Sequence, residues 1–288
     1  MEARNEIREF LISRRDKLTP EMAGLPIYGR NRRVKGLRRE EVAMLAGISV
    51  EYYTRLERGN AAGASEDVLE AVARALQLDD AERAHLFDLV RATNNTRPPN
   101  RRPAQDRVRP TLQRILDSIT APAYLRNGRL DVLAANTLGA ALYAPVLADA
   151  VGTPNMARFI FLNDRATDFF DQWDCAAHDA VGILRAQAGR DPYDRRLSDL
   201  IGELSTRSDE FRVRWAAHDV KFHRTGAKKL HHPVVGELTL DYEAMELPGD
   251  NGQRILVYTA EPGSPSDDGL RLLASWATTS AAVAADKA

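Results

Sequence analysis

Hydrophobic residues at helical spacing dominate the first third of the chain and predict a small all-α domain. The first helix is predicted from four apolar positions, Ile7, Phe10, Leu11 and Leu18. Two short helices are expected over residues 38–46 and 49–58, after an irregular loop over 19–37 that is rich in proline and glycine. An N-cap at Ser65 and a capping box at residues 79–82 predict two more, so that the domain has about five helices.

Beyond residue 110 the pattern mixes strands with helices. Four short runs have strand character, namely residues 123–125, 130–133, 237–243 and 254–260. The first two flank a turn at Asn127 and Gly128, and the last two are expected to pair antiparallel. Several helical segments lie between 136 and 218, and a closing helix is predicted over 270–278.

The stretch of chain between these two parts is rich in proline and arginine. Residues 97–110 contain four prolines and five arginines. Because proline fixes φ and removes a backbone donor, this stretch is predicted as a semi-extended linker. The fold class is therefore predicted as an all-α domain over 1–96, joined by the linker 97–110 to an α+β domain over 111–280.

The composition is that of ordinary globular proteins, with 44% hydrophobic and 28% charged residues and a net charge of −1. A length of 288 residues suits two domains. The lone cysteine, Cys175, excludes an internal disulfide and is typical of a reducing compartment. The N-terminus lacks the apolar segment of a signal peptide, and no apolar run of about 18 residues occurs. We therefore expect a cytoplasmic protein without membrane contact.

The segment over residues 39–59 predicts two helices that cross at a sharp turn. Ala43 is small where the helices pack, Gly47 permits the positive φ of the turn, and Ser49 caps the second helix. The side chains expected to face inward are Val42, Ala46, Ile48, Tyr53 and Leu56. This arrangement predicts a helix-turn-helix, whose second helix enters the major groove of double-stranded DNA.

The end of this segment, residues 56–59, resembles the XRE-type helix-turn-helix family, which implies a sequence-specific transcription regulator. Glu57 is expected to pair with Arg14 or Arg15 of the first helix rather than to contact DNA. We expect the DNA contacts from the preceding loop and from the motif: Arg30, Arg32, Arg33, Lys35, Arg38, Arg39, Ser49, Val50, Glu51, Tyr52, Thr54, Arg55 and Arg58.

Within this set, Arg55 is the best candidate to bind a guanine through two hydrogen bonds. Glu51 either accepts a hydrogen bond from cytosine or complements the dipole of its helix. The basic cluster over residues 30–39 contains no acid, and it either binds phosphates or forms a solvated loop. We expect a homodimer on a roughly palindromic site, because two-fold symmetry of the protein then matches two half-sites about one helical turn apart.

Segments along nearly the whole chain are similar to the MmyB-like subfamily of these regulators. They are residues 36–43, 50–57, 128–136, 188–192, 202–205, 211–220, 236–243 and 258–264. The resemblance implies that the C-terminal domain has a PAS-like fold with a cavity for a small-molecule effector, and no cofactor. It also implies an apolar, lipid-like or fatty-acid-like ligand. Ala135 departs from the tryptophan that the family often has there.

Candidate ligand residues are aromatic or polar side chains of the second domain: Asn136, Phe159, Phe161, Phe170, Trp173, Phe211, Trp215, His218 and Tyr242. Phe211, Trp215 and His218 have the spacing of one helix face, which is either part of an apolar pocket or a buried stripe. Asn136 either contacts the ligand or caps the helix that follows it.

Other classes of function are weaker. Cys175 and His178 could form a nucleophilic dyad, but the motifs of nucleophilic and nucleotide-binding enzymes are missing, so we predict no enzyme. A metal site would need the histidines at 218, 223, 231 and 232. Residues 231 and 232 would point apart in a strand. The alternative that stays open is a regulator whose second domain serves only dimerisation or a partner protein.

Overall fold

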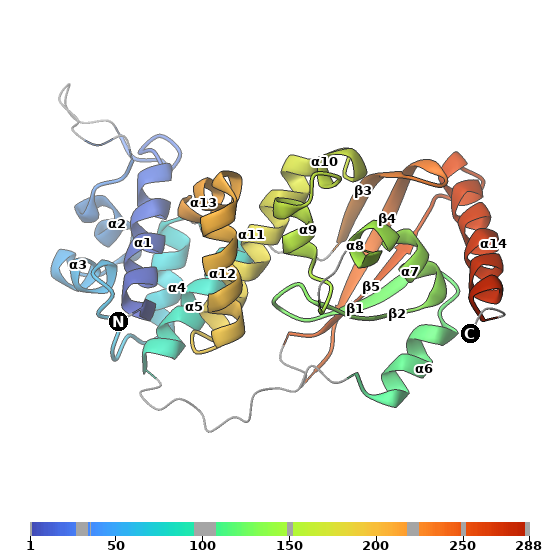
Figure 1. Cartoon of the computed structure of the whole chain (residues 1–288). Helices are drawn as coiled ribbons and strands as arrows, with labels where there is room; N and C mark the ends of the chain where they lie inside the picture. Colours follow the sequence, from blue (N-terminus) through green and yellow to red (C-terminus); the bar gives the residue numbers. More distant parts are fainter. Residues whose placement is uncertain are drawn as a thin grey trace. The chain divides into compact units, whose positions relative to one another are not determined.

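The computed structural model describes residues 2–26, 34, 36–94, 108–148, 152–217, 225–248 and 252–285. Contacts divide the chain into two compact units, whose elements are labelled in Figure 1. Unit 1 comprises Met1–Asn100, Arg185–Asp199 and Val213–Lys221. Unit 2 comprises Arg101–Leu184, Leu200–Arg212 and Phe222–Ala288. The sequence analysis assigned all of 111–280 to one domain, whereas the contacts group two of its segments with unit 1.

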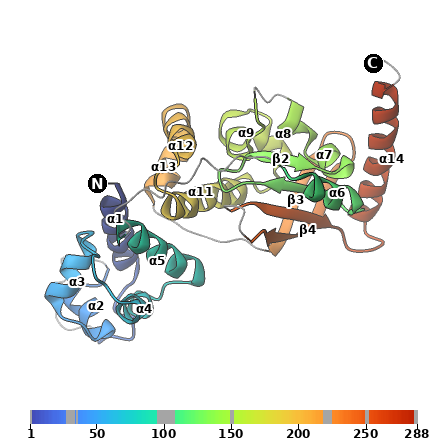
Figure 2. The same ribbon diagram turned by 90° about the horizontal axis from the view of Figure 1, so that it is seen from below.

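The N-terminal part of unit 1 forms five helices within its described residues, as the sequence predicted. They are α1 (Glu2–Lys17), α2 (Arg39–Ala46), α3 (Val50–Glu57), α4 (Glu66–Ala75) and α5 (Asp80–Asn94). Figure 2 shows this group from below. Their apolar stripes form one core that includes Ile7, Phe10, Val42, Tyr53, Leu56, Val72, Leu86 and Leu89. Burial of about 1.5–3 kcal/mol per large side chain stabilises helices that would be marginal alone.

Side-chain caps fix where these helices begin. The Ser49 hydroxyl accepts the backbone N–H of Tyr52 at 3.1 Å, and Ser65 caps α4 in the same way. At α5, the Asp79 carboxylate accepts the N–H of Glu82 at 2.8 Å, while the Glu82 carboxylate accepts the N–H of Asp79 at 3.1 Å. The predicted caps and the capping box are confirmed.

Later segments of the chain also belong to unit 1. They include the ends of two helices, α11 (Trp173–Arg190) and α13 (Asp209–Ala216). Arg185 is 1% exposed, and its guanidinium pairs with Glu6 at 3.2 Å and lies 4.2 Å from the ring centre of Trp215. A Cβ at Gly189 would lie 2.7 Å from a ring nitrogen of His85, so glycine permits α11 to approach α5. These long-range contacts explain why the segments belong to unit 1.

Unit 2 contains a five-stranded antiparallel sheet in the order β2-β1-β5-β4-β3. Its strands are β1 (Ala123–Arg126), β2 (Val132–Ala135), β3 (Thr225–His232), β4 (Gly236–Glu246) and β5 (Arg254–Thr259). The predicted pairs β1–β2 and β4–β5 are confirmed. The sequence analysis did not predict β3, which is an edge strand with two lysines. Charged side chains are common on such edges and weaken the apolar alternation.

The helices of the second half are α6 (Pro110–Ser118), α7 (Thr137–Leu142), α8 (Ala144–Ala148), α9 (Met156–Leu162), α10 (Ala166–Phe169), α12 (Arg195–Arg207) and α14 (Pro265–Ala285), besides α11 and α13. The predicted closing helix is therefore longer than 270–278. With the sheet, these helices confirm an α+β second half. In the described part of the chain, no helix is long and apolar enough to cross a membrane.

The two faces of the sheet contact different helices. Register places Tyr124 beside Leu256, and Tyr242 beside Tyr258. Because side chains alternate along a strand, Tyr124, Tyr242 and Tyr258 share one face with Arg126, which we call the inner face. On the opposite face, α6 packs into a cluster formed by Leu112, Leu116, Ala123, Leu125 and Ile255. The sequence pattern had predicted the other four strands but neither β3 nor which helices cover each face.

Candidate functional site

The turn between α2 and α3 has the geometry that the sequence predicted. Gly47 has a φ of +66°, and the N–H of Ile48 donates to the carbonyl of Ala43 at 3.0 Å. Gly59, with a φ of +81°, follows α3, and a Cβ there would lie 2.1 Å from the carbonyl oxygen of Arg4. Both glycines are therefore required, one by the turn and the other by the close approach of α1.

Helix α3 exposes the polar side chains that were expected to face DNA. Glu51, Arg55 and Arg58 are exposed, and Tyr52 is half-buried. The Arg55 guanidinium lies 4.6 Å from the ring centre of Tyr52, in cation–π geometry. This contact restricts the orientation of Arg55 before any DNA is bound, which lowers the entropy that binding would cost.

Glu57 holds three helices together, although it lies at the end of α3. Its carboxylate is 1% exposed and accepts from Arg15 of α1 at 2.6 Å and from Arg39 of α2. The hydroxyl of Tyr53 donates to it at 3.4 Å, and Arg15 also donates to the carbonyl of Leu37 at 2.8 Å. Burial raises the pKa of Tyr53 above its ordinary value. The predicted pairing of Glu57 with Arg15 is confirmed.

The start of α2 differs in part from the expectation. Arg14 pairs with Glu82 at 2.6 Å and not with Glu57. The Nε of Arg39 binds Glu57, so this side chain has a structural role besides any phosphate contact, and 47% of it remains exposed. Arg38 is exposed at the helix N-cap. The other cluster members, Arg30, Arg32, Arg33 and Lys35, lie outside the described residues, and their phosphate contacts stay predictions.

The inner face of the sheet in unit 2 carries a continuous aromatic cluster. Tyr124 is 5.0 Å from Tyr143 of α7 and 6.1 Å from Tyr258, measured between ring centres. Tyr242 is 5.8 Å from Tyr258. We define the aromatic cluster as these rings with the phenylalanines that contact them: Tyr124, Tyr143, Phe159, Phe169, Phe170, Tyr242 and Tyr258. It is a large buried surface with polar atoms inside it.

The tyrosines of the cluster are neutral hydrogen-bonding groups. The Tyr143 hydroxyl donates to the Tyr258 hydroxyl at 2.8 Å. Burial raises the pKa of both phenols well above the ordinary value, and raises the pKa of Tyr242 to about 12. Neutral phenols can donate to an acceptor within an apolar setting, which is the combination expected where a ligand is bound.

The predicted ligand residues fall into separate places. Phe159, Phe170 and Tyr242 belong to the aromatic cluster. A second group joins Phe161, Trp173 and Phe211, with Phe161 and Phe211 5.1 Å apart. Helix α13 ends at Ala216, so the predicted helix face can be followed only through Phe211 and Trp215. Trp215 instead contacts Arg185 within unit 1, and His218 lies outside the described residues.

Asn136 is a helix cap whose hydrogen-bonding capacity is fully used. Its Oδ1 accepts from the N–H groups of Gly139 at 2.7 Å and Ala123 at 3.0 Å. Its Nδ2 donates to the carbonyls of Ile119 and Ala121 at 2.8 and 2.7 Å. A side-chain amide has two donors and an oxygen with two lone pairs, so no capacity is left for a ligand. The capping alternative is confirmed.

Sequence reasoning missed part of the aromatic cluster and one cation beside it. Tyr124 and Arg126 alternate on β1, but the burial of this short strand on both faces hid which residues share a face, whereas Tyr258 of β5 was a weaker candidate beside Tyr242. The tyrosines at alternate positions of predicted strands were the signal that could have found them. Arg126, a charged residue at the end of an otherwise apolar run, was a second such signal.

The metal and nucleophile alternatives gain no support from the described residues. His232 is buried, its Nε2 lies 3.1 Å from the carbonyl of Ala141, and its Nδ1 accepts from Val234, while His231 is exposed. Burial lowers the pKa of His232 below its ordinary value. Where the structure describes the chain, no three His, Cys, Asp or Glu side chains are placed to hold a metal ion. Cys175 is exposed.

A capped helix-turn-helix joined to an α+β domain with a buried aromatic cluster defines a DNA-binding transcription regulator with a ligand-binding domain. Residues 28–86 match the family model for a helix-turn-helix domain. Residues 108–273, more than half of the chain, match the MmyB-like transcription regulator ligand binding domain. The chain belongs to this family of MmyB-like regulators. Both matched domains are of regulatory and not enzymatic type. No curated protein matches the sequence.

Proposed function

We propose that the protein recognises a specific operator through α3 and responds to a small, apolar, fatty-acid-like effector bound by unit 2. The observation that carries the DNA part is the exposed Arg55, oriented by Tyr52 on a helix that Ser49 caps. The aromatic cluster on the inner face supports the effector part, because ligand sites are mostly apolar with a few convergent polar groups.

The fold of unit 2 is proposed to be PAS-like. A five-stranded antiparallel sheet in the order β2-β1-β5-β4-β3, with α7 to α13 inserted between β2 and β3, supports this proposal. Such an insertion places helices over one face of the sheet, where Tyr143 contacts Tyr258 of β5 and Phe169 contacts Tyr143. The proposed effector would contact this face.

We further propose that two copies bind a roughly palindromic operator. Two-fold symmetry of the protein then matches the half-sites, about one helical turn apart. An effector changes DNA affinity only if it binds one arrangement of the dimer more tightly than the other. Exposed Leu272 and Trp276 lie one turn apart on α14 and favour association through that helix. This also supports the second candidate, a C-terminal domain used only for dimerisation or a partner protein.

Substitution of Arg55 tests the DNA part. An operator is first selected from random duplexes, and affinity is measured on it and on unrelated DNA. Arg55→Ala is expected to lose about 1–3 kcal/mol on the operator with little change on unrelated DNA, because one base contact is removed. Arg91→Ala, an exposed arginine of α5, is the matched control and should change neither affinity. Equal losses on both duplexes would refute a base-specific role for Arg55.

Native mass spectrometry of gently purified protein tests the effector part. A dimer with a discrete small apolar adduct, identified after denaturing extraction, is the expected result. A dimer that takes up no apolar compound from a panel of fatty acids and alcohols would favour the second candidate.

A further inference from the structure

Helices α11, α12 and α13 are each divided between the two units. In α11 the division falls at Arg185, since Leu184 is the last residue of this helix in unit 2 and Arg185 is the first in unit 1. Earlier on the same helix, the carboxylate of Asp179 lies 3.9 Å from Nζ of Lys228 in β3, within unit 2. Backbone hydrogen bonds join consecutive turns of a helix, so its residues move together. Helix α11 thus links contacts made in one unit to contacts made in the other.

Arg185 is buried where three helices of unit 1 meet. Its guanidinium pairs with the carboxylate of Glu6 of α1 at 3.2 Å, donates to the backbone carbonyl of Trp215 on α13, and lies 4.2 Å from the centre of that indole ring. A planar guanidinium can bind an acid and a carbonyl at its edge while it stacks on an aromatic face. Arg185 therefore connects α1 to both α11 and α13, and we call this set of contacts the Arg185 anchor.

The neighbouring contacts of α11 with α5 are of a different kind. Arg190 lies 3.6 Å from the carboxylate of Asp88, which also pairs with Arg91 at 3.2 Å. These side chains are partly exposed, and such pairs contribute little to stability. At Gly189 the two helices meet by packing, because a Cβ there would lie 2.7 Å from a ring nitrogen of His85. The Arg185 anchor is thus the buried polar contact at this end of α11.

Helix α1, which the anchor holds, is bonded directly to the helix that is proposed to read DNA. Arg15 of α1 pairs with Glu57 of α3 at 2.6 Å. The backbone of Arg4 approaches Gly59, just after α3, so closely that a Cβ at Gly59 would lie 2.1 Å from its carbonyl oxygen. Because α1 contacts α3 near both of its own ends, the position of α3 depends on that of α1.

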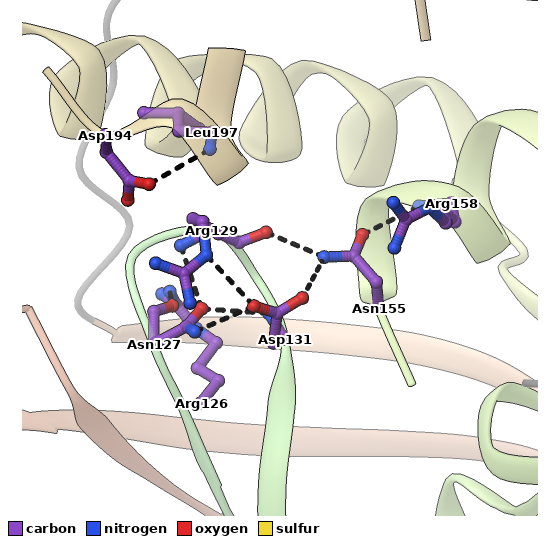
Figure 3. A network of polar contacts seen from close by, with 8 residues as sticks. All are labelled: Arg126, Asn127, Arg129, Asp131, Asn155, Arg158, Asp194 and Leu197. Atoms are coloured by element: carbon purple, nitrogen blue, oxygen red, sulfur yellow. Dashed lines mark hydrogen bonds and ion pairs between the residues drawn. The ribbon is translucent and has the colours of Figure 1, made fainter. Parts of the chain in front are cut away.

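The polar network at the turn between β1 and β2 provides a contrast. The Asp131 carboxylate accepts from the side-chain amides of Asn127 and Asn155 at 2.8 Å each and from Arg129 at 3.1 Å, as Figure 3 shows. These four residues all belong to unit 2, and their bonds to one another fix the turn to the start of α9. The charged residues of α11 differ, because Asp179 has its partner in unit 2 whereas Arg185 has its partner in unit 1.

We propose that Arg185 is the positioning residue through which α11 couples effector binding to DNA binding. This inference rests on the proposed function and concerns its regulation. While the anchor is intact, a displacement of α11 that accompanies effector binding also moves α1 and, with it, α3. The effector then changes DNA affinity, because it favours one position of α3 over another. Without the anchor, α1 keeps its contacts with α3 and α5 but no longer follows α11.

Decanoate, as a fatty-acid probe, and the selected operator test this coupling in the full-length protein. Operator affinity is measured with and without saturating decanoate, and the ratio of the two affinities is the response. Wild-type protein is expected to respond about fivefold or more. Arg185→Met keeps the buried aliphatic stem but removes the guanidinium, and its response should disappear. Arg190→Met, on the same helix, removes only the partly exposed pair with Asp88 and should keep most of the response.

Glu6→Gln tests the anchor from the side of α1. Its amide still accepts a hydrogen bond from Arg185 but the charge is lost, so the response should fall less than in Arg185→Met. A wild-type response in Arg185→Met would overturn the inference and leave the effector part of the proposed function standing. Operator affinity of the wild-type protein that does not change with decanoate would overturn that part, and this inference with it.

Native-state hydrogen exchange, without DNA or decanoate, distinguishes positioning from a general role in stability. In Arg185→Met the amides of residues 185–190 should exchange about tenfold faster or more, because the end of α11 has lost its buried attachment. The amides of α2 and α3 should exchange as in wild type. Equal acceleration in all helices of unit 1 would show that Arg185 stabilises the fold as a whole, and would overturn the inference. Unchanged exchange at residues 185–190 would overturn it as well.

Discussion

The two units differ in whether their buried charged side chains have ion-pair partners. In unit 1, Glu57 lies between Arg15 and Arg39, and Arg185 meets Glu6. On the inner face of unit 2, Arg126 is as deeply buried, yet no described acid pairs with it. The matched charges connect helices and are part of the fold. The guanidinium of Arg126 donates instead to the backbone carbonyl of Asn127.

Buried polar side chains within unit 2 also differ in their hydrogen-bond partners. Asn136 is buried with four hydrogen bonds to the backbone, whereas the phenols of the aromatic cluster bond chiefly to one another. A saturated polar group fixes the local structure. Groups that can exchange one partner for another remain able to meet a ligand.

The largest effect is expected from Glu57→Gln. The change leaves Arg15 buried beside a neutral amide, and breaking one side of a buried pair costs about 3–5 kcal/mol. Urea unfolding followed by helical circular dichroism measures it. Glu70→Gln is the control, because its pair with Arg83 at 2.6 Å is half-exposed and contributes at most about 1 kcal/mol. Similar losses in both variants would show that burial does not distinguish the two pairs.

A smaller loss, about 2–4 kcal/mol, is expected for Asn136→Ala. The change removes the cap of α7 and leaves the carbonyls of Ile119 and Ala121 unpaired. Asn136→Asp keeps the oxygen that accepts from Gly139 and should therefore lose less. Thermal unfolding measures both variants. Unchanged stability combined with weaker binding of the fatty acids in the panel named above would instead make Asn136 a ligand contact.

The smallest effect concerns pH. Burial lowers the pKa of His232 in the folded protein, so below about pH 6.5 the unfolded chain takes up a proton that the folded protein resists. Stability should therefore fall as the pH drops through that range, by at most about 1.4 kcal/mol per pH unit. His232→Gln should flatten this slope. His231→Gln, at the exposed neighbouring position, should leave it unchanged, and an equal change in both would refute the role of burial.

The DNA-binding motif was predictable from sequence because its determinants are local. Gly47, Ser49 and Ser65 act on residues within one turn of themselves, and the structure places each as expected. The pairing of Glu57 with a basic residue of α1 was also predicted, with Arg14 and Arg15 as the alternatives, and the structure selects Arg15. Arg39 was expected to contact DNA. Its guanidinium also pairs with the Glu57 carboxylate, because α2 packs against α3.

In unit 2 the strand pairs were predictable, whereas the site was not. The residues of the aromatic cluster come from β1, α7, α9, α10, β4 and β5, so their meeting depends on strand register and on which helices cover the inner face. The helix face predicted through Phe211, Trp215 and His218 can be followed only as far as Trp215, because α13 ends at Ala216 and His218 lies outside the described residues.

The sequence by itself determined the class of the protein: a capped helix-turn-helix and an α+β second half. These features arise from caps, turns and periodicities that act over a few residues. The tertiary structure decided which charges are matched. Glu57 meets Arg15 and Arg126 meets no described acid because burial and partnership are set by chain segments far apart in sequence, and only folding brings those segments into contact.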